Sequence, residues 1–441
     1  MVVGRIQNIG RTIWDHKKKT AFGGLLVYWG MSWVKNNQRN ASIRTLYAQE
    51  ALEMGNVKVS AESRPRRITI LANTSANERH VWDEFSTNAL PLFHLAGIEV
   101  NVIKTDSSDQ LEKLSSVLDG EEADGLYIVG GDGTMQRVLT AIYKEKDYAP
   151  LPIGFAPGGY DCLALKSLVP TVFNTSTDVR RWCESAMSVI EDTRREVSIT
   201  QTTVSTKDNE VPLIEYGLSP IYGGWFGHIE ERRRKLWYWA GLKRRFAYFW
   251  EMLKRSPSPT VVSIEYEEFC PGCSSCRAPI VIDKPEWRWW HILTGRPKSI
   301  LPSVQYKDYS KIMNESCGKK GEAISEAVEF NIHTEQIDDT SRLHLRAING
   351  MGRIGVMREG WSRCSNDCVA TSSNQDIYNT DIIARSINMT INAIPSFLSR
   401  VYIAGDSVKV EEGDSIQVKT TNKKAQIFLP STLRINLDQV N

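Results

Sequence analysis

The chain of 441 residues is long enough for two or three domains, and a hydrophobic content of 41% supplies enough apolar side chains for buried cores. A formal net charge of +2 excludes a strongly charged macromolecule as the partner that organises the whole chain, so only local basic patches are informative. Eight cysteines in a chain of this length exclude a small disulfide-stabilised scaffold.

Residues 1–60 differ in composition from the rest of the chain. Basic residues are scattered through them with few acids, and the run Thr20–Val34 carries no charge. This run is shorter than the about 20 residues that cross a bilayer as a straight helix, but Tyr28, Trp29 and Trp33 suit a membrane interface. We interpret the segment as a mitochondrial targeting sequence or a non-cleaved membrane anchor. A cleaved secretory signal and a buried core helix are the alternatives.

Residues 61–194 alternate between strand-like and helix-like segments. Short apolar runs predict strands at residues 68–72, 99–104, 126–129 and 152–156. Helical spacing or length predicts helices at residues 79–96, 107–118 and 135–142. This alternation predicts an α/β fold with an open parallel sheet and right-handed crossover connections.

One strand-to-helix junction in this region has the sequence Gly130-Gly131-Asp132-Gly133-Thr134, hereafter the glycine turn. Glycines let main-chain N–H groups approach an anion closely, and the N-terminus of the following helix attracts negative charge. Asp132 would repel a phosphate unless a cation lay between them, so the junction predicts a metal–nucleotide site or a site that activates a hydroxyl group. A plain glycine turn without a ligand is the alternative.

Polar or glycine-rich residues also end the neighbouring predicted strands. Asn73 follows the first strand, Thr105 follows the second, and Pro157-Gly158-Gly159 follows the fourth. The carboxyl ends of parallel strands meet at one edge of a sheet, where ligands bind. We therefore expect these residues to converge with the glycine turn in one crevice.

Residues 195–441 have the pattern of a mostly β, sandwich-like domain. Strand-like alternation occurs at residues 196–202, 261–266, 327–333, 342–348 and 399–429. Basic and aromatic residues are concentrated at 231–255, which predicts a helix that either lies on an anionic membrane surface or packs on the sheet with a solvated basic face. No nucleic-acid partner is expected, because no binding module accompanies this helix. Residues from about 254 to 326 are interpreted as an extended insertion.

Three cysteines of this insertion, Cys270, Cys273 and Cys276, have the spacing Cys-x-x-Cys-x-x-Cys. Such spacing can place thiolates around zinc, but a closed structural zinc site needs four ligands. The candidates for a further ligand are Cys317, Cys364 and Cys368. Disulfides in an oxidising compartment and unpaired loop cysteines are the alternatives, and structural zinc is not the favoured interpretation.

The glycine turn, the strand that ends at Asn73 and the turn Pro157-Gly158-Gly159 together resemble the catalytic domain of the diacylglycerol kinase superfamily, where the corresponding elements are Asn-Pro, Gly-Gly-Asp-Gly-Thr and Pro-x-Gly. Within this superfamily the chain is most similar to the mitochondrial acylglycerol kinases. The resemblance implies a nucleotide-binding catalytic domain at 61–194 and a β-rich lipid-binding domain at 195–441. It also implies transfer of the γ-phosphoryl group of ATP, with Mg²⁺, to the hydroxyl of mono- or diacylglycerol.

The resemblance further implies roles for single residues. The main chain of the glycine turn would hold the ATP phosphates through Gly130, Gly131, Gly133 and Thr134. The residues that would line the nucleotide site beside it are Asn73, Thr105 and Gly159. Asp132 would hold Mg²⁺ or act on the acceptor hydroxyl. The family's base commonly comes from an Asp-Gly-Glu-like segment, whose nearest match here makes Asp406 a candidate base, with an ordinary turn aspartate as the favoured alternative.

Three positions depart from the family pattern and keep other functions open. Thr74 stands in place of proline, Arg137 in place of an acidic residue, and Tyr160-Asp161-Cys162 in place of a Thr-Gly-Asn-type segment. These departures predict weaker or altered nucleotide binding. They leave a non-catalytic inner-membrane scaffold or protein-import subunit as one alternative. A NAD kinase is another, because NAD kinases also carry a glycine-aspartate turn, but a membrane anchor and Pro157-Gly158-Gly159 count against it.

The resemblance also implies a location and partners. It places the protein at the mitochondrial inner membrane, facing the intermembrane space. The expected partners are acylglycerol lipids, the membrane surface and a membrane protein complex.

Overall fold

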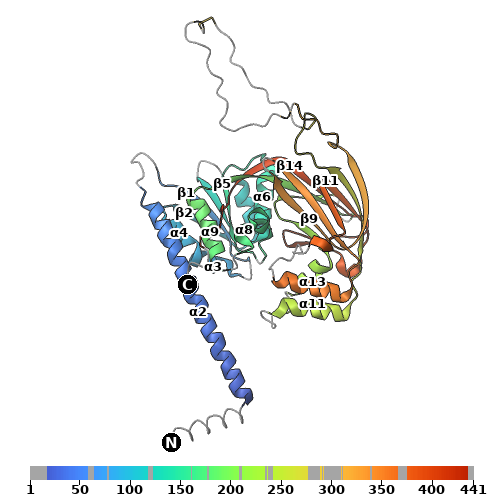
Figure 1. The fold of residues 1–441 in the computed structure, drawn as a ribbon. Coiled ribbons are helices and arrows are strands. Elements are labelled where there is room, and N and C mark those ends of the chain that lie inside the picture. The colour runs from blue at the N-terminus through green and yellow to red at the C-terminus, as the bar shows by residue number, and fades with distance from the viewer. Residues whose placement is uncertain are drawn as a thin grey trace.

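The computed structural model describes residues 17–57, 64–76, 79–117, 123–159, 161–175, 178–207, 211–233, 236, 242–276, 289–290, 292, 309, 311–337, 340–365 and 375–435. The basic residues before position 17, Tyr160, Cys368 and most of the predicted insertion beyond Cys276 lie outside the described residues. Figure 1 shows a helix-flanked sheet region beside a second region of long strands, with one long helix along the first region.

Four parallel strands form the centre of the first region. They are β1 (Arg67–Asn73), β2 (Glu99–Thr105), β3 (Gly125–Gly130) and β4 (Ile153–Pro157). Their order is β2-β1-β3-β4, and each pair is parallel. Strands β3 and β4 are buried along their whole length, as expected for apolar strands with helices on both faces. The apolar runs from which strands were predicted lie in these four elements.

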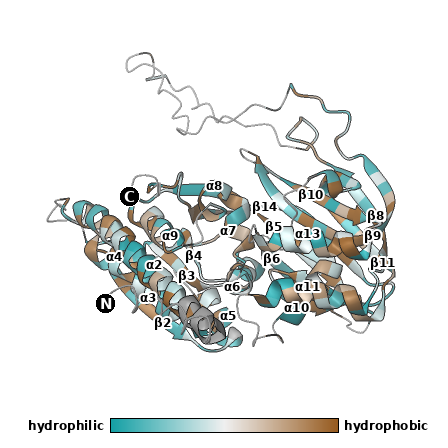
Figure 2. Ribbon diagram, turned by 60° about the horizontal axis from the view of Figure 1, so that its bottom comes forward, coloured by the Kyte–Doolittle hydropathy of each residue, from teal (hydrophilic) through white to brown (hydrophobic). Residues whose placement is uncertain are grey.

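Helices cover both faces of these strands (Figure 2). One face carries α3 (Val81–Asn88), α4 (Leu90–Leu95) and α9 (Arg180–Ile190). The other carries α5 (Ser108–Val117), α6 (Asp132–Glu145), α7 (Leu163–Leu168) and α8 (Pro170–Phe173). The helix predicted at 79–96 is divided at Ala89, because Pro91 at the start of α4 cannot donate a hydrogen bond to the preceding turn.

Helix α2 (Lys17–Gly55) joins the N-terminal segment to this region. Its C-terminal half buries Ile43, Tyr47 and Ala51 against α4 and α9, and the hydroxyl of Tyr47 donates a hydrogen bond of 2.6 Å to the carboxylate of Glu184. Its N-terminal half instead exposes apolar side chains. They include Leu26, Val27, Tyr28, Trp29, Met31, Trp33 and Val34. Within the described part of the chain, no helix combines the length and the hydropathy needed to cross a membrane.

The second region is built from antiparallel strands. Their bounds are β5 (Arg194–Ser205), β6 (Leu213–Gly217), β7 (Ile221–Gly224), β8 (Thr260–Glu268), β9 (Lys320–Ile337), β10 (Thr340–Asn349), β11 (Thr380–Ala393), β12 (Arg400–Ile403), β13 (Asp406–Lys409) and β14 (Ser415–Phe428). Their inward side chains form one apolar core. The sequence analysis does not predict β6, β7 or β11, because the first two are short and end in glycine and the third has Arg385 and Ser386 at its centre.

Helices pack against one end of these strands. They are α10 (Trp225–Arg233), α11 (Lys243–Lys254) and α13 (Arg353–Ser365), with the short 3-10 turns η3 (Gln375–Ile377) and η4 (Ser396–Leu398). Trp225, Phe226, Tyr248 and Val356 form their shared core. The helix predicted at 231–255 is therefore two helices, and most residues between them lie outside the described residues.

Strand β14 joins the two sheet regions. It is antiparallel to β5 and β11, and its residues Ile427 and Phe428 pair in parallel with β4, so that β4 has a neighbour on both sides. Leu429 and Ile435, which follow, lie in the cores of the first region. The predicted boundary at 194/195 falls at the start of β5, but the C-terminal end of the predicted 195–441 domain packs with the α/β region.

Candidate active site

The glycine turn spans the junction of β3 and α6, as the sequence predicts: Gly130 ends the strand, and residues 132–134 form the first turn of the helix. Gly131 is the N-cap residue of α6, so the N–H groups of the first helical turn have no partner within the helix and can bind an anion. A Cβ atom at Gly130 would lie 2.5 Å from the Cβ of Thr134. A Cβ atom at Gly159 would lie 2.9 Å from the Cα of Gly131 and 3.3 Å from the main-chain nitrogen of Asp132. The two turns therefore meet through their main chains, which requires glycine.

Asn73 connects the end of β1 to the glycine turn. Its Nδ2 donates a hydrogen bond of 3.0 Å to Oγ1 of Thr134, and its Oδ1 accepts hydrogen bonds from the main chain and side chain of Ser75. The buried side chain of Thr105 instead donates to the carbonyl of Ala72 at 3.3 Å. Asn73 thus orders the site directly, whereas Thr105 orders the sheet edge beneath it.

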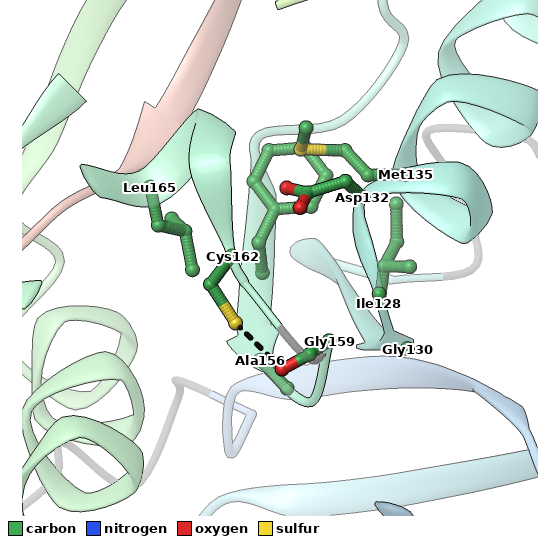
Figure 3. A pocket seen from close by; sticks show the side chains of 10 residues that line it. Ile128, Gly130, Asp132, Met135, Ala156, Gly159, Cys162 and Leu165 are labelled. Carbon is green, nitrogen blue, oxygen red and sulfur yellow. Dashed lines mark hydrogen bonds between the residues drawn. The ribbon is translucent and has the colours of Figure 1, made fainter. Parts of the chain in front are cut away.

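The carboxylate of Asp132 connects the glycine turn to α7. It accepts hydrogen bonds from the N–H groups of Leu163 at 2.9 Å and Ala164 at 3.1 Å. Figure 3 shows it turned toward the segment that carries Cys162 and Leu165. Burial raises the pKa of Asp132 to about 6, although the two N–H groups favour its charged form. Asp132 therefore caps a helix and faces the candidate site at the same time.

Asp406 reaches the glycine turn from the other end of the chain. Ala404 and Gly405, with φ of 51° and 84°, form the tight turn between β12 and β13. This turn places Oδ2 of Asp406 3.2 Å from the position of a Cβ atom at Gly133. Nη2 of Arg137 on α6 donates a hydrogen bond of 2.8 Å to the same oxygen. Asp406 is the first residue of β13, directly after this turn, and tertiary structure places it at the candidate site.

A cleft of about 480 Å³ lies between the glycine turn and the second region. The predicted site residues that line it are Asn73, Gly131, Asp132, Gly133, Thr134, Gly159 and Asp406. Gly130 lines a small cavity below the glycine turn, which Figure 3 shows, and Thr105 is not among the described lining residues of the cleft. The structure thus brings together most of the predicted residues, including Asp406.

The opposite wall of the cleft carries charged side chains that the sequence analysis does not single out. The buried carboxylate of Glu230 on α10 accepts hydrogen bonds from Arg233, from Nε of Arg244 at 3.1 Å and from the hydroxyl of Tyr248 at 2.8 Å. Arg233 also lies 3.4 Å from the carboxylate of Asp161. Burial raises the pKa of Asp161, and the positive charge of Arg233 lowers it in part. The sequence shows that residues 231–255 are rich in basic side chains, but it does not show which of these side chains turn inward.

An aromatic surface lies beside these charges. Tyr222 on β7 stacks on Tyr402 on β12, with ring centroids 5.3 Å apart. The hydroxyl of Tyr402 donates a hydrogen bond of 3.0 Å to the carboxylate of Glu231. Both rings line the cleft, so this wall offers apolar area next to charge.

Contacts between α6 and β6 hold the two walls in register. Oγ1 of Thr140 donates a hydrogen bond of 3.2 Å to the carbonyl of Tyr216 and accepts one of 2.9 Å from its N–H group. A Cβ atom at Gly217 would lie 1.6 Å from Oε1 of Gln136, so the helix approaches the strand more closely than other residues would allow. The glycine turn and the second region are therefore attached through the helix that the turn begins.

Comparison with known proteins assigns a family to this arrangement. Residues 67–201 match the model of the diacylglycerol kinase catalytic domain. An uncharacterised protein of Caenorhabditis elegans is 44% identical over 440 residues, which cover 99% of each chain. The mitochondrial acylglycerol kinases of mouse and human are 29% and 28% identical over 260 residues, and the match spans only 58% of this chain and 59% of each relative. The chain therefore belongs to the lipid kinase family that is defined by the diacylglycerol kinase catalytic domain.

Proposed function

We propose that this protein is an ATP-dependent acylglycerol kinase, which transfers the γ-phosphoryl group of ATP to the hydroxyl of mono- and diacylglycerol and so forms lysophosphatidic and phosphatidic acid. The observation that carries the proposal is the cleft in which a main-chain anion site, at the start of α6, faces the carboxylate of Asp406. Phosphoryl transfer needs these two parts, because catalysis depends on holding phosphates and positioning an acceptor hydroxyl. The relatives named acylglycerol kinase support the substrate class.

The glycine turn fits the phosphates of ATP. Side chains at Gly131 or Gly159 would fill the space beside the first N–H groups of α6, and these N–H groups supply donors and the positive end of the helix dipole. Mg²⁺ prefers carboxylate and phosphate oxygens, so Asp132 with the nucleotide phosphates would hold it, and the ion would neutralise charge on the transferred group. Asn73 keeps Thr134, and with it the first turn of α6, in place.

Asp406 fits the acceptor side. Its side chain is 59% exposed and faces the glycine turn. An oxygen of this carboxylate would accept the proton of the lipid hydroxyl as the hydroxyl oxygen attacks the γ-phosphorus, the bond from the γ-phosphorus to the β–γ bridging oxygen breaks and ADP leaves. Arg137, on the same helix as the anion site, orients this carboxylate through its hydrogen bond. The family departure at position 137 is thus accommodated by an ion pair within the site.

Two exposed surfaces support action at a membrane. The N-terminal half of α2 exposes aromatic and aliphatic side chains, and Figure 1 shows it on the same lower side of the molecule as α11 and α13. The exposed apolar residues of these two helices are Phe249, Trp250, Leu253, Ile354 and Trp361. Basic residues such as Lys254, which lies over the ring of Trp250, would add attraction to anionic lipids. The named relatives are mitochondrial, which supports a mitochondrial location. Our proposal is that the protein acts at the inner mitochondrial membrane, facing the intermembrane space, with a membrane protein complex as a further partner.

The test is transfer of labelled γ-phosphate from Mg-ATP to monoacylglycerol and diacylglycerol in detergent micelles. We expect labelled lysophosphatidic and phosphatidic acid from the full chain, and a decrease of about 100-fold in Asp406→Asn, because removal of a general base typically costs at least this much. The exposed Asp83 on α3 provides the matched control, since Asp83→Asn lies outside the cleft and should keep full activity. Folded protein that phosphorylates neither lipid would contradict the proposal.

A non-catalytic scaffold is the second candidate, and one observation favours it. Both oxygens of Asp132 already accept main-chain hydrogen bonds, and Asp406 forms an ion pair with Arg137. The two carboxylates therefore also have structural roles. A scaffold would bind membranes without consuming ATP. The same assay with labelled ATP and NAD separates the three functions, because a NAD kinase would label NADP and a scaffold would label nothing.

A further inference from the structure

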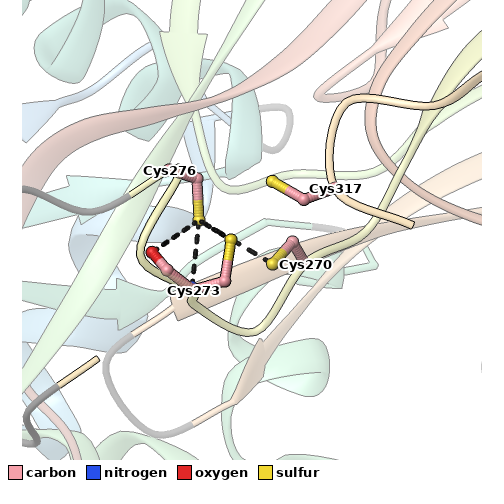
Figure 4. Close-up of side chains that lie close together, drawn as sticks. All are labelled: Cys270, Cys273, Cys276 and Cys317. Atoms are coloured by element: carbon pink, nitrogen blue, oxygen red, sulfur yellow. Dashed lines mark hydrogen bonds between the residues drawn. The ribbon is translucent and has the colours of Figure 1, made fainter. Parts of the chain in front are cut away.

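Strand β8 and the start of β9 lie within the span 254–326 that was predicted to be an insertion, so the insertion begins only after β8 and ends before β9. A cluster of cysteines lies at its base, away from the cleft. Cys270, Cys273 and Cys276 follow β8, and Cys317 precedes β9, so two separate chain segments contribute. All four sulfur atoms lie within 4.8 Å of one another. Figure 4 shows the side chains turned toward one another from the two segments. The fold therefore selects Cys317 as the fourth member of the motif.

The separations of the sulfurs fit a single bound ion better than disulfides. Sγ of Cys276 lies 3.6 Å from Sγ of Cys273 and 3.7 Å from Sγ of Cys270. A disulfide bond is about 2.0 Å long. Zn–S bonds of about 2.3 Å in a tetrahedron place the sulfurs about 3.8 Å apart. The two separations from Sγ of Cys276 match those of a tetrahedral tetrathiolate site, and the limit of 4.8 Å on all four sulfurs is compatible with it.

The main chain around the cluster is shaped for thiolate ligands. Gly272 and Gly318 have φ of 137° and 81°, which lets the chain turn tightly next to Cys273 and Cys317. The N–H group of Cys273 points to Sγ of Cys276 at 3.3 Å. Nδ2 of Asn314 lies 3.2 Å from Sγ of Cys270. Such N–H donors stabilise the negative charge that thiolates carry when they coordinate a metal.

We propose that Cys270, Cys273, Cys276 and Cys317 bind one structural Zn²⁺ ion. Four thiolates at tetrahedral spacing leave no open coordination position, which is typical of structural rather than catalytic zinc. The candidate Cys364 does not take part, because it packs on the apolar core of the helices at the end of the β region. The zinc interpretation, which the sequence alone does not favour, becomes the favoured one because the structure supplies the missing ligand.

The ion would join the two segments from which the insertion starts and ends. Main-chain hydrogen bonds already connect them, from Glu268 to the carbonyl of Lys319 at 3.0 Å and from Ser274 to the carbonyl of Ile312 at 2.9 Å. Zinc would tie the segment of Cys276 to that of Cys317 at the end of the β8–β9 pair. Its loss should therefore loosen this end of the sheet without reaching the glycine turn.

The test is metal analysis of the untagged full chain, purified under reducing conditions and without added metal. We expect inductively coupled plasma mass spectrometry to find about one zinc ion per chain. A thiol-modifying mercurial should release this zinc to a colorimetric chelator as the thiols react. Cys317→Ser should lower the zinc content at least tenfold, whereas the matched variant Cys364→Ser should keep it.

The native chain keeps the test decisive even if Cys317→Ser fails to fold. Folded protein with no bound zinc and four freely reactive thiols would overturn the proposal. Intact-mass measurement that finds these cysteines paired as disulfides would overturn it as well. Stoichiometric iron in place of zinc would assign the site to a different metal and reject zinc.

Discussion

The two walls of the cleft are built in different ways. The wall at the glycine turn consists of main chain from the two short segments 130–134 and 157–159, and its contacts depend on the absence of side chains. The opposite wall consists of charged side chains from α10, α11 and the start of β13, and of aromatic side chains from β7 and β12. A main-chain anion site should be sensitive to any added side-chain volume, whereas an ion-paired wall should be sensitive to the loss of one charge. Three substitutions test this difference.

The largest expected effect is on the charged wall. In Glu230→Gln, Arg233 and Arg244 lose the buried carboxylate between them, so we expect the free energy of unfolding to fall by about 3 kcal/mol. The neighbouring Glu231 pairs with Arg400 but has 28% of its side chain exposed, so Glu231→Gln should cost less than about 1 kcal/mol. Urea titration followed by tryptophan fluorescence measures both. Equal effects at the two positions would show that burial of this network does not matter.

The second effect is a pH dependence of the unfolding free energy that arises from Asp132 in the glycine turn. Because the folded-state pKa of Asp132, about 6, lies above the unfolded value of 3.8, the folded protein binds this proton more tightly. The stability that results is fully present below about pH 4 and is lost as the pH rises through about 6, by up to about 3 kcal/mol.

Asp132→Asn removes this dependence. The unfolding free energy of the natural chain should therefore fall relative to that of the variant between about pH 4 and pH 7, and the difference should be constant above that range. Urea titrations of both proteins across this range measure it. Parallel curves for the two proteins would show that Asp132 titrates normally in the fold.

The smallest expected effect is on ATP binding. In Gly159→Ala, the new methyl group meets Cα of Gly131 and covers the N–H group of Asp132, so we expect the affinity for Mg-ATP to fall about tenfold, or about 1.4 kcal/mol. Calorimetric titration measures this. Gly352→Ala is the control, because a methyl group there meets nothing within 4 Å. An unchanged affinity in Gly159→Ala would place the phosphates elsewhere.

Local patterns in the sequence predicted the elements of the first wall. The run 126–129 lies in β3, and the residues from 135 to 142 with helical spacing lie in α6, so the glycine turn falls at the junction where it was expected. Both patterns depend on neighbours within one turn or one strand. The division of the helix predicted at 79–96 was missed, although Pro91 was visible in the sequence. Proline is common in the first turn of a helix, and the sequence did not show that a second helix begins at residue 90.

The second wall was largely invisible in the sequence. Asp406 was singled out only through a weak family match, and its contact with Arg137 spans most of the chain. Asp161 was noted only as part of a departure from the family pattern, and Glu230 was not singled out at all, because nothing local distinguishes a buried charged residue from a solvated one. Thr105 illustrates the converse: it follows a predicted strand, but its side chain bonds to the adjacent strand rather than lining the cleft.

By itself, the sequence determined where the four parallel strands, most helices of the first region and the glycine turn occur, because these depend on residue spacing and on the conformational freedom of glycine. Tertiary structure alone decided which distant residues meet: Asp406 with the glycine turn, the end of β14 with β4, and Cys317 with the three earlier cysteines. The physical reason is that such contacts are set by strand pairing and helix packing over hundreds of residues. No local pattern encodes the partner of a single side chain.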